Sequence, residues 1–288
     1  MSTKIELNYK TKITSSELDA LRIEFPNGVV FFDLETTGLS PLVNKIIEIG
    51  AIKIANDSVS YFSTLINPKV KIPEATIKIH KITDDMVEDS ELIEQVLPRF
   101  MSFISDHSLV AHNAKFDIGF LVVSLNNLNL PIPQSNIYCS CQYARSTFKE
   151  SRNHKLSTLA KMLGLGLENH HRATDDAITC LQITAQGLIQ KKKSIKKQKI
   201  CVLSDYQKEN MKIPDHLSLL PSLTANQELI EIIYDGGSQK GKFRKVKPTA
   251  LLPMPNGNVL YALCLGSNIY KTFAISKIKE IRTTNKLT

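Results

Sequence analysis

The amino-acid sequence predicts an α/β fold, with a mixed sheet flanked by helices over residues 28–190 and a small β-barrel-like domain over residues 227–288. The first part begins with an apolar, β-branched and aromatic run at residues 29–32, which is typical of a strand buried on both faces. Strands come first and helices alternate with strands later, which indicates helices packed on a mixed sheet. Residues 228–288 contain short β-rich runs separated by glycine and asparagine turn signals, which are typical of a small, twisted all-β module.

Two further strands follow the first one closely. Residues 45–55 and 58–67 are β-rich, and the turn signal Asn56-Asp57 separates them, so we expect an antiparallel meander. The later elements are predicted from apolar periodicity and from cap residues. They are helices over 90–105, 115–128, 140–148, 156–163 and 174–190, and strands over 109–111 and 136–139.

The segments on either side of this fold are predicted to be accessory. Residues 1–27 form an N-terminal leader with a helix over 15–25, capped by Ser15 or Ser16. Residues 191–226 form a basic linker, because its first nine residues include six lysines and the remainder shows weak periodicity. The lysine run is either a solvated linker or a site of sequence-independent phosphate contact.

The composition predicts a cytoplasmic protein without a membrane partner. The chain has 288 residues, 42% hydrophobic and 22% charged, which is ordinary for a globular protein. No apolar run approaches the roughly 18 residues that a membrane-spanning helix requires, and the N-terminus is too polar for a secretory signal. The five cysteines lack Cys-x-x-Cys spacing, so we expect reduced thiols.

The net charge of +8 is unevenly distributed. Residues 1–190 carry 18 Lys and Arg against 21 Asp and Glu, a net charge of −3, whereas residues 191–288 carry 18 against 7, a net charge of +11. Such asymmetry predicts an acidic catalytic body joined to a basic region that handles an acidic partner.

Two carboxylates stand at the end of the first strand. Because side chains at i and i+2 point to the same face of a strand, Asp33 and Glu35 are expected to lie side by side. Two ionised acids this close repel each other, and a divalent cation with oxygen ligands is the simplest way to hold them together. The alternative is that they only polarise the strand end before a turn.

Two more acids are expected at helix starts. Asp117 and Asp176 each lie in a first helical turn, where the helix dipole alone favours an acid, and Asp175 could fill the structural role of Asp176. Thr174 is the expected N-cap of the second helix. Together with Asp33 and Glu35, however, these acids suit two hard cations, and a nearby histidine, His171, could take a proton from water.

Three stretches carry a family resemblance. They are Phe32–Leu39, Ala111–Asp117 and His171–Ala177, and they resemble, in order, the three motifs of the DEDD exonucleases of the histidine subgroup. The chain is similar to the proofreading epsilon subunit of the bacterial replicative polymerase and its stand-alone cousins over residues 28–190. This resemblance implies a ribonuclease H-like fold and metal-dependent 3′→5′ hydrolysis of nucleic acid.

The resemblance also implies roles for individual residues. The family's spacing selects His171 and Asp176 rather than His170 and Asp175, with His171 as general base for the attacking water. It implies two Mg²⁺ or Mn²⁺ ions, with four metal ligands that are also catalytic. These are Asp33, Glu35, Asp117 and Asp176.

Four further residues match family positions near the substrate. For these a role in a turn or in packing is the alternative, and they are Thr36, Gly38, His80 and Asn113. The expected substrate is the 3′ end of nucleic acid, single-stranded DNA in particular, in DNA repair, replication or degradation. Alternatives are a polymerase proofreading subunit, an exoribonuclease, or an inactive nucleic-acid-binding regulator.

The C-terminal residues resemble part of a WYL domain, a small SH3-like barrel of bacterial regulators that bind nucleic acid or nucleotide ligands. Asn258 and Val259 replace the Trp-Tyr pair, and Ala274 replaces the usual arginine, which puts ligand sensing in doubt. The alternatives are that this domain binds the nucleic-acid substrate, or that it has a structural or protein-docking role.

The segment 215–220 is similar to a peptide that docks on the sliding clamp, with Leu217 and Leu219 as anchors; a plain linker is the alternative. Nucleic acid, the clamp and a polymerase are thus the expected partners.

Overall fold

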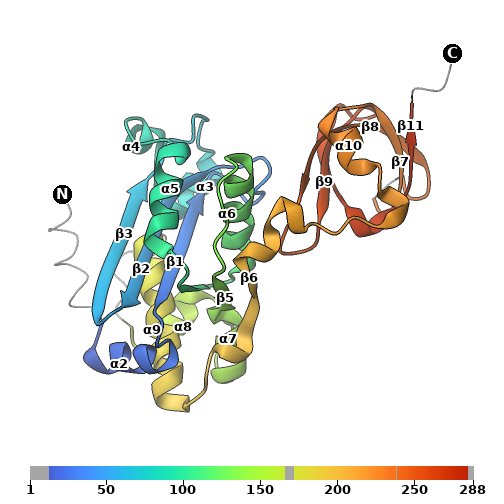
Figure 1. Cartoon of the computed structure of the whole chain (residues 1–288). Helices are drawn as coiled ribbons and strands as arrows, with labels where there is room; N and C mark the ends of the chain where they lie inside the picture. The colour runs from blue at the N-terminus through green and yellow to red at the C-terminus, as the bar shows by residue number, and fades with distance from the viewer. Residues whose placement is uncertain (1–12, 166–171, 238, 285–288) are drawn as a thin grey trace. The chain divides into compact units, whose positions relative to one another are not determined.

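The computed structural model describes residues 13–165, 172–237 and 239–284 and divides into two compact units, Met1–Ser204 and Asp205–Thr288 (Figure 1). Each unit has its own sheet and its own hydrophobic core.

The first unit is built on a six-stranded mixed sheet with the order β3-β2-β1-β4-β5-β6. Strands β1, β2 and β3 form the predicted antiparallel meander, β4 and β5 run parallel to β1, and β6 is antiparallel to β5. The mixed sheet predicted from the sequence is therefore confirmed. The strands are β1 Val29–Thr36, β2 Ile46–Ala55, β3 Ser58–Leu65, β4 Ser108–Ala111, β5 Asn136–Cys139 and β6 Lys199–Val202.

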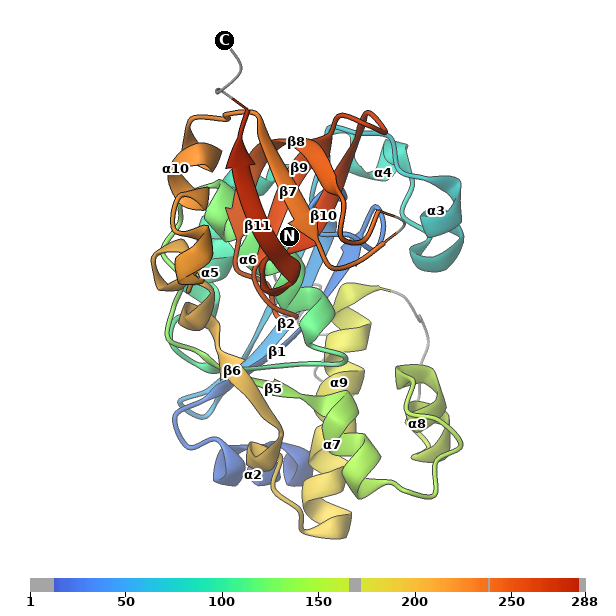
Figure 2. The same cartoon turned by 90° about the vertical axis from the view of Figure 1, so that its right-hand side faces the viewer.

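Helices cover both faces of this sheet. The long helix α9 packs on β1 and β2 together with α2, and α7 and α8 lie beside α9 (Figure 2). On the other face, Phe32 of β1 packs against Phe100 of α5, with ring centroids 6.1 Å apart. The helices are α2 Ser15–Glu24, α3 Glu74–His80, α4 Asp84–Val87, α5 Ile93–Ile104, α6 Lys115–Asn127, α7 Ser140–Thr147, α8 Leu156–Met162 and α9 Ala173–Lys191.

The N-terminal helix α2 begins at Ser15, but its cap is Thr14 rather than Ser15 or Ser16. Thr14 and Glu17 form a reciprocal capping box: the Glu17 amide donates to Thr14 Oγ1 (3.3 Å), and the Thr14 amide donates to Glu17 Oε2 (2.8 Å). Glu17 is buried, and its other oxygen accepts from Gln186 of α9. The expected leader thus contains a helix that is packed into the first unit.

Residues 191–226, expected to be a linker, contain regular elements. Strand β6 completes the first sheet, and Tyr143 of α7 donates from its hydroxyl to the Lys193 carbonyl (2.6 Å). Weak periodicity was the wrong signal for this segment, because single-turn elements are too short to show one. They are the 3₁₀ helices Lys196–Gln198, Leu203–Tyr206, Lys208–Asn210 and Asp215–Leu217, and helix α10 Leu220–Ala225.

The second unit holds a five-stranded antiparallel sheet with the order β10-β9-β8-β7-β11. Among the residues that the structure describes, no pairing joins β10 to β11, so the sheet is open and the predicted barrel-like closure is not formed. The strands are β7 Ile230–Tyr234, β8 Phe243–Leu252, β9 Val259–Cys264, β10 Ile269–Ala274 and β11 Ile278–Thr283.

One face of this second sheet packs against α10 and the turn before it. Leu217 is fully buried in this core together with Leu220, Leu260 and Phe273. The interpretation of segment 215–220 as a clamp-docking peptide is therefore wrong for the folded unit, because Leu217, one of its two proposed anchors, is inaccessible.

Across both units, none of the helices within the described ranges is long and apolar enough to cross a membrane.

Candidate active site

Three carboxylates meet at one end of the first sheet. Asp33 and Glu35 project from the same face of β1, and Asp176 comes from the first turn of α9. One oxygen of each carboxylate lies within 4.8 Å of the others, and all three side chains are half-buried. The structure thus brings together two acids that are two positions apart in the sequence and a third that is distant.

Gly50 is what allows α9 to come this close. It pairs with Asp33 across the β1–β2 ladder. A Cβ atom built on Gly50 would lie 2.1 Å from the Thr174 amide nitrogen and 2.2 Å from the Ala173 carbonyl carbon. Since both atoms are backbone, a larger residue here would displace the start of α9, and Asp176 with it.

Glu48 holds the same helix start through its carboxylate. It lies two residues before Gly50, is 2% exposed, and pairs with Glu35 across the ladder. Arg172 donates to Glu48 Oε1 from Nη2 (2.7 Å) and from Nε (3.1 Å), and the Ala173 amide donates to Oε2 (3.0 Å). Glu48 therefore accepts a hydrogen bond from an amide at the start of α9 that has no partner within the helix. The N-cap residue of α9 is Arg172, so the prediction of Thr174 as N-cap is wrong.

Glu48 and Arg172 were missed as site residues, although both lie in stretches that the sequence singled out. The signal in the sequence was Glu48 itself, a single acid inside the largely buried strand β2, Ile46–Ala55, where an unpaired carboxylate would be costly. A cation elsewhere in the chain had to compensate it. Which cation does so is a matter of tertiary contact rather than of sequence spacing.

Asp117 is a fourth acid close to this group. It lies in the first turn of α6, is 2% exposed, and accepts a hydrogen bond at Oδ1 from the Leu34 amide (3.3 Å). It stands outside the set of three oxygens, but its charge contributes to the potential at Asp33.

The electrostatics of the group disfavour four ionised acids. Burial, followed by the neighbouring charges of Asp117, Asp176, Glu35 and Glu48, raises the pKa of Asp33 well above its usual range. Burial and the neighbouring acids likewise raise the pKa of Glu35 to about 8, against a smaller lowering by Arg172. Burial raises the pKa of Asp117 to about 8, although hydrogen bonds from its own amide and from the Leu34 amide oppose the shift.

This donor set fits a divalent cation. Hard cations such as Mg²⁺ and Mn²⁺ take carboxylate oxygens as ligands, and a positive charge at this point would remove the repulsion that raises these pKa values. The arrangement is therefore suited to binding divalent metal ions.

The remaining predicted residues make local contacts. Thr36 is buried and donates from its hydroxyl to the Gly38 carbonyl (2.7 Å), inside the turn after β1. His80 is 2% exposed, and its Nδ1 accepts from the Ile82 amide (3.0 Å). Asn113 has a φ of 64° in the turn between β4 and α6. His171, the expected general base, lies outside the described residues.

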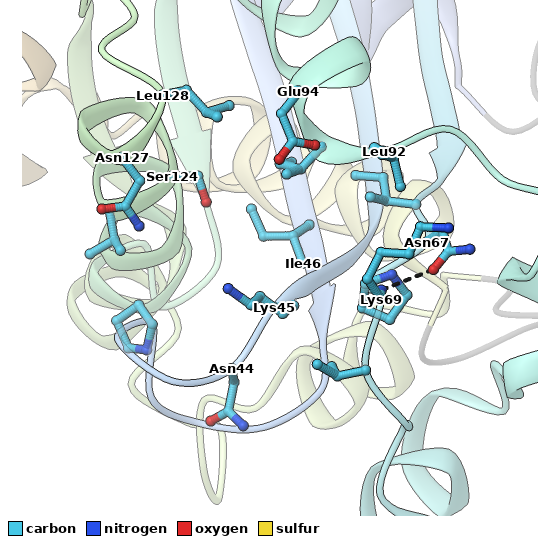
Figure 3. A pocket seen from close by; sticks show the side chains of 16 residues that line it. Asn44, Lys45, Ile46, Asn67, Lys69, Leu92, Glu94, Ser124, Asn127 and Leu128 are labelled. Carbon is cyan, nitrogen blue, oxygen red and sulfur yellow. Dashed lines mark hydrogen bonds between the residues drawn. The ribbon is translucent and has the colours of Figure 1, made fainter. Parts of the chain in front are cut away.

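A cavity of about 340 Å³ in the first unit lies elsewhere. It is lined by the loops around Asn44 and Asn67, the start of α5 and the second half of α6, and Figure 3 shows Lys45, Glu94 and Ser124 around it. None of the nine predicted site residues lines it. This cavity is therefore separate from the acidic group.

The acidic group lies within a stretch that matches a known family. The family described as Exonuclease (RNase_T) matches residues 30–184, a span that includes all the acids named above. The chain belongs to this exonuclease family.

Three similar proteins illustrate the range of this exonuclease family. A PolC-type DNA polymerase III of Clostridium perfringens is 36% identical over 270 residues, which cover 89% of this chain and 18% of the polymerase. E. coli Exonuclease I in complex with a dT13 oligonucleotide has a TM-score of 0.55 at 13% identity, covering 91% of this chain and 66% of that one. The nuclease domain of 3′hExo, a DEDDh family member bound to rAMP, has a TM-score of 0.50 at 18% identity, covering 59% and 95%.

These similarities concern the fold of the chain and the metal dependence of its family. The two solved structures show the same fold, and the family is dependent on divalent metal ions. The exonuclease spans 18% of the length of the first curated relatives that it matches.

Proposed function

We propose that this exonuclease shortens single-stranded DNA from its 3′ end with two Mg²⁺ or Mn²⁺ ions. The observation that carries the proposal is the meeting of Asp33, Glu35 and Asp176, whose oxygens lie within 4.8 Å of one another. Acids held this close would repel each other and destabilise the fold unless they serve to bind cations.

The four acids would divide the two ions between them. Asp33, Glu35 and Asp176 would hold one ion, and Asp33 and Asp117 the second. Two such ions would supply charge stabilisation for both the entering and the departing oxygen of an in-line displacement. His171 would take the proton of the attacking water.

Glu48 and Arg172 would act on this centre by positioning. Their ion pair and the Ala173 hydrogen bond fix the first turn of α9, and Asp176 lies within that turn. A ligand held on a rigid helix start needs little rearrangement when a cation binds, which favours rapid hydrolysis.

Four residues would contact the terminal nucleotide. Thr36 and Gly38 form the turn that follows the ligands of β1, and Asn113 occupies the turn that precedes Asp117. His80, at the end of α3, would complete this group. Their local backbone contacts give these residues fixed positions, which a substrate contact requires.

DNA is the favoured substrate because the curated relatives are DNA polymerases, and E. coli Exonuclease I was solved in complex with a dT13 oligonucleotide. An RNA substrate is the alternative that the rAMP bound to 3′hExo suggests. The pathway we propose is DNA replication or repair in the cytoplasm.

A second candidate function is proofreading in association with a DNA polymerase. The similarity to the C. perfringens polymerase covers 89% of this chain and so extends beyond the matched exonuclease residues 30–184. A partner polymerase would then deliver a mispaired 3′ end to the acidic group.

The test uses matched DNA and RNA strands of about 20 nucleotides and the same sequence, long enough to show stepwise shortening. Initial rates of nucleotide release are measured with Mg²⁺, with Mn²⁺ and with a chelator. We expect release from DNA with either ion, slower release from RNA, and none with the chelator. Release in the chelator would refute the metal assignment, and faster release from RNA would refute the choice of DNA. Stimulation by an added polymerase would favour proofreading.

A further inference from the structure

The sheet of the second unit has one buried face and one open face. Alternate residues of β9 differ sharply: Leu260 and Ala262 are fully buried in the core, whereas Tyr261 and Leu263 are half-buried and point to the other side. Strands β8, β9 and β10 lie side by side (Figure 2), so this open face continues across three strands.

Two tyrosines form a stack on the open face. Tyr270 of β10 pairs with Leu263, and Thr272 pairs with Tyr261, so the two tyrosines are diagonal neighbours. Their ring centroids lie 5.2 Å apart at an interplanar angle of 22°. Tyr270 is 54% exposed, so the stack presents an aromatic surface on which a further planar ring can lie.

Two lysines stand on the same face. Lys247 of β8 pairs with Leu263, which places Lys247, Leu263 and Tyr270 in one row across three strands. Lys245 lies two residues earlier on β8; both lysines are exposed, while Val246 between them is buried. We call Lys245, Lys247, Tyr261 and Tyr270 the tyrosine–lysine face.

The charge around the tyrosine–lysine face is positive. The sequence has no Asp or Glu between Asp235 and Glu280, a stretch that includes all of β8, β9 and β10. The acid nearest in the ladder is Glu231 of β7, which pairs with Lys245 on one side and with Arg282 of β11 on the other. An anion is therefore the complementary occupant.

We propose that the tyrosine–lysine face binds single-stranded nucleic acid, with bases stacked on Tyr261 and Tyr270 and phosphates beside Lys245 and Lys247. Every base has a flat face that can stack on an aromatic ring, and a row of lysines can follow the backbone without reading sequence. An exposed stack beside two lysines offers both contacts at once. This proposal rests on the proposed function, because the same strand would be shortened at the acidic group.

The binding experiment uses the full chain with a chelator, which prevents turnover, and a fluorescein-labelled dT20 strand. Anisotropy is measured from about 50 to 300 mM salt, because phosphate contacts give a salt slope. The double variants are Tyr261→Ala/Tyr270→Ala, Tyr261→Phe/Tyr270→Phe and Lys245→Gln/Lys247→Gln. The charge-matched control is Lys277→Gln/Lys279→Gln, which removes two lysines of the same unit that do not belong to the tyrosine–lysine face.

The two kinds of contact predict different results. The Ala variant should weaken binding by about five- to a hundredfold at an unchanged salt slope, and the Phe variant should bind like the parent. The Lys245→Gln/Lys247→Gln variant should lower the salt slope by about 0.7 for each phosphate that a lysine no longer neutralises. An equal decrease in the control would show that general charge, not this face, binds the strand and would overturn the proposal.

Hydrolysis of a trinucleotide separates this inference from the proposed function. If the parent fails to hydrolyse it, the proposed function fails. If the parent hydrolyses it and the Ala variant binds dT20 as tightly as the parent, the tyrosine–lysine face is refuted and the active site stands. The Phe variant is the control for misfolding, because phenylalanine keeps the aromatic ring that stacking requires. Equally weak binding by the Phe and Ala variants would exclude stacking as the cause and overturn the proposal.

Discussion

Gly50→Ala tests the close approach of α9 to β2 that positions Asp176. The added Cβ would lie 2.1 Å from the Thr174 nitrogen, whereas real Cβ contacts are essentially never under 3.0 Å. The start of α9 must therefore move away by about 0.9 Å or more. No side chain can absorb this movement, because the three nearest atoms are all backbone.

The displacement has two consequences of known size. Overpacking of this kind costs about 1–3 kcal/mol of unfolding free energy. A shift of about 1 Å in a catalytic group costs about 10²-fold in rate. Because Asp176 lies in the first turn of the displaced helix, we expect Gly50→Ala to lose activity by about that factor while it stays folded.

The assay compares initial rates on a short oligonucleotide with thermal unfolding in the presence and absence of Mn²⁺. The parent should gain stability from Mn²⁺, whereas Gly50→Ala should gain little, because one ligand has moved. Gly266→Ala is the matched control, since nothing lies within 4 Å of its Cβ position. A Gly50→Ala variant with parental activity and a parental Mn²⁺ shift would refute this account of the helix position.

Three other predictions concern the same centre. His171→Ala should lower turnover by about 10²–10⁴-fold at unchanged substrate affinity; the same decrease in His170→Ala, with His171→Ala active, would refute the assignment. Glu48→Ala should lower the unfolding free energy by about 1.5–3 kcal/mol, because the α9 amide and Arg172 lose a charged acceptor, and chemical denaturation measures it. The metal-free protein should lose stability as the pH rises from about 4 to about 8: the pKa values of Glu35 and Asp117 are raised to about 8, so the folded state keeps protons that the unfolded chain releases near pH 4. Thermal unfolding across this range should become less pH-dependent with Mn²⁺; a flat metal-free profile would contradict the electrostatics.

The sequence predicts the sheet and its acids well because those signals are local. The burial of β1 follows its apolar run, and Asp33 and Glu35 share a face because strands alternate. The choice of Asp176 over Asp175 came from the family's spacing, and the structure places Asp176 with the other two acids.

One missed feature is local: Thr14 rather than a serine caps α2, because Glu17 closes a capping box with it three residues later. The other features that the sequence did not predict depend on contacts between distant residues. The role of Glu48 at the start of α9 requires Arg172, which is 124 positions away. Strand β6 forms because β5 offers an open edge, and a lysine-rich segment carries no sign of that.

Above all, we propose that Asp33, Glu35 and Asp176 hold metal for 3′→5′ hydrolysis. The most direct test of this role compares Asp176→Asn with Asp175→Asn on a 5′-end-labelled single strand in Mg²⁺. We expect the parent and Asp175→Asn to produce a ladder that shortens one nucleotide at a time, while Asp176→Asn leaves the strand intact although it remains folded. An inactive Asp175→Asn beside an active Asp176→Asn, or immediate release of the label as a mononucleotide, would contradict the claim.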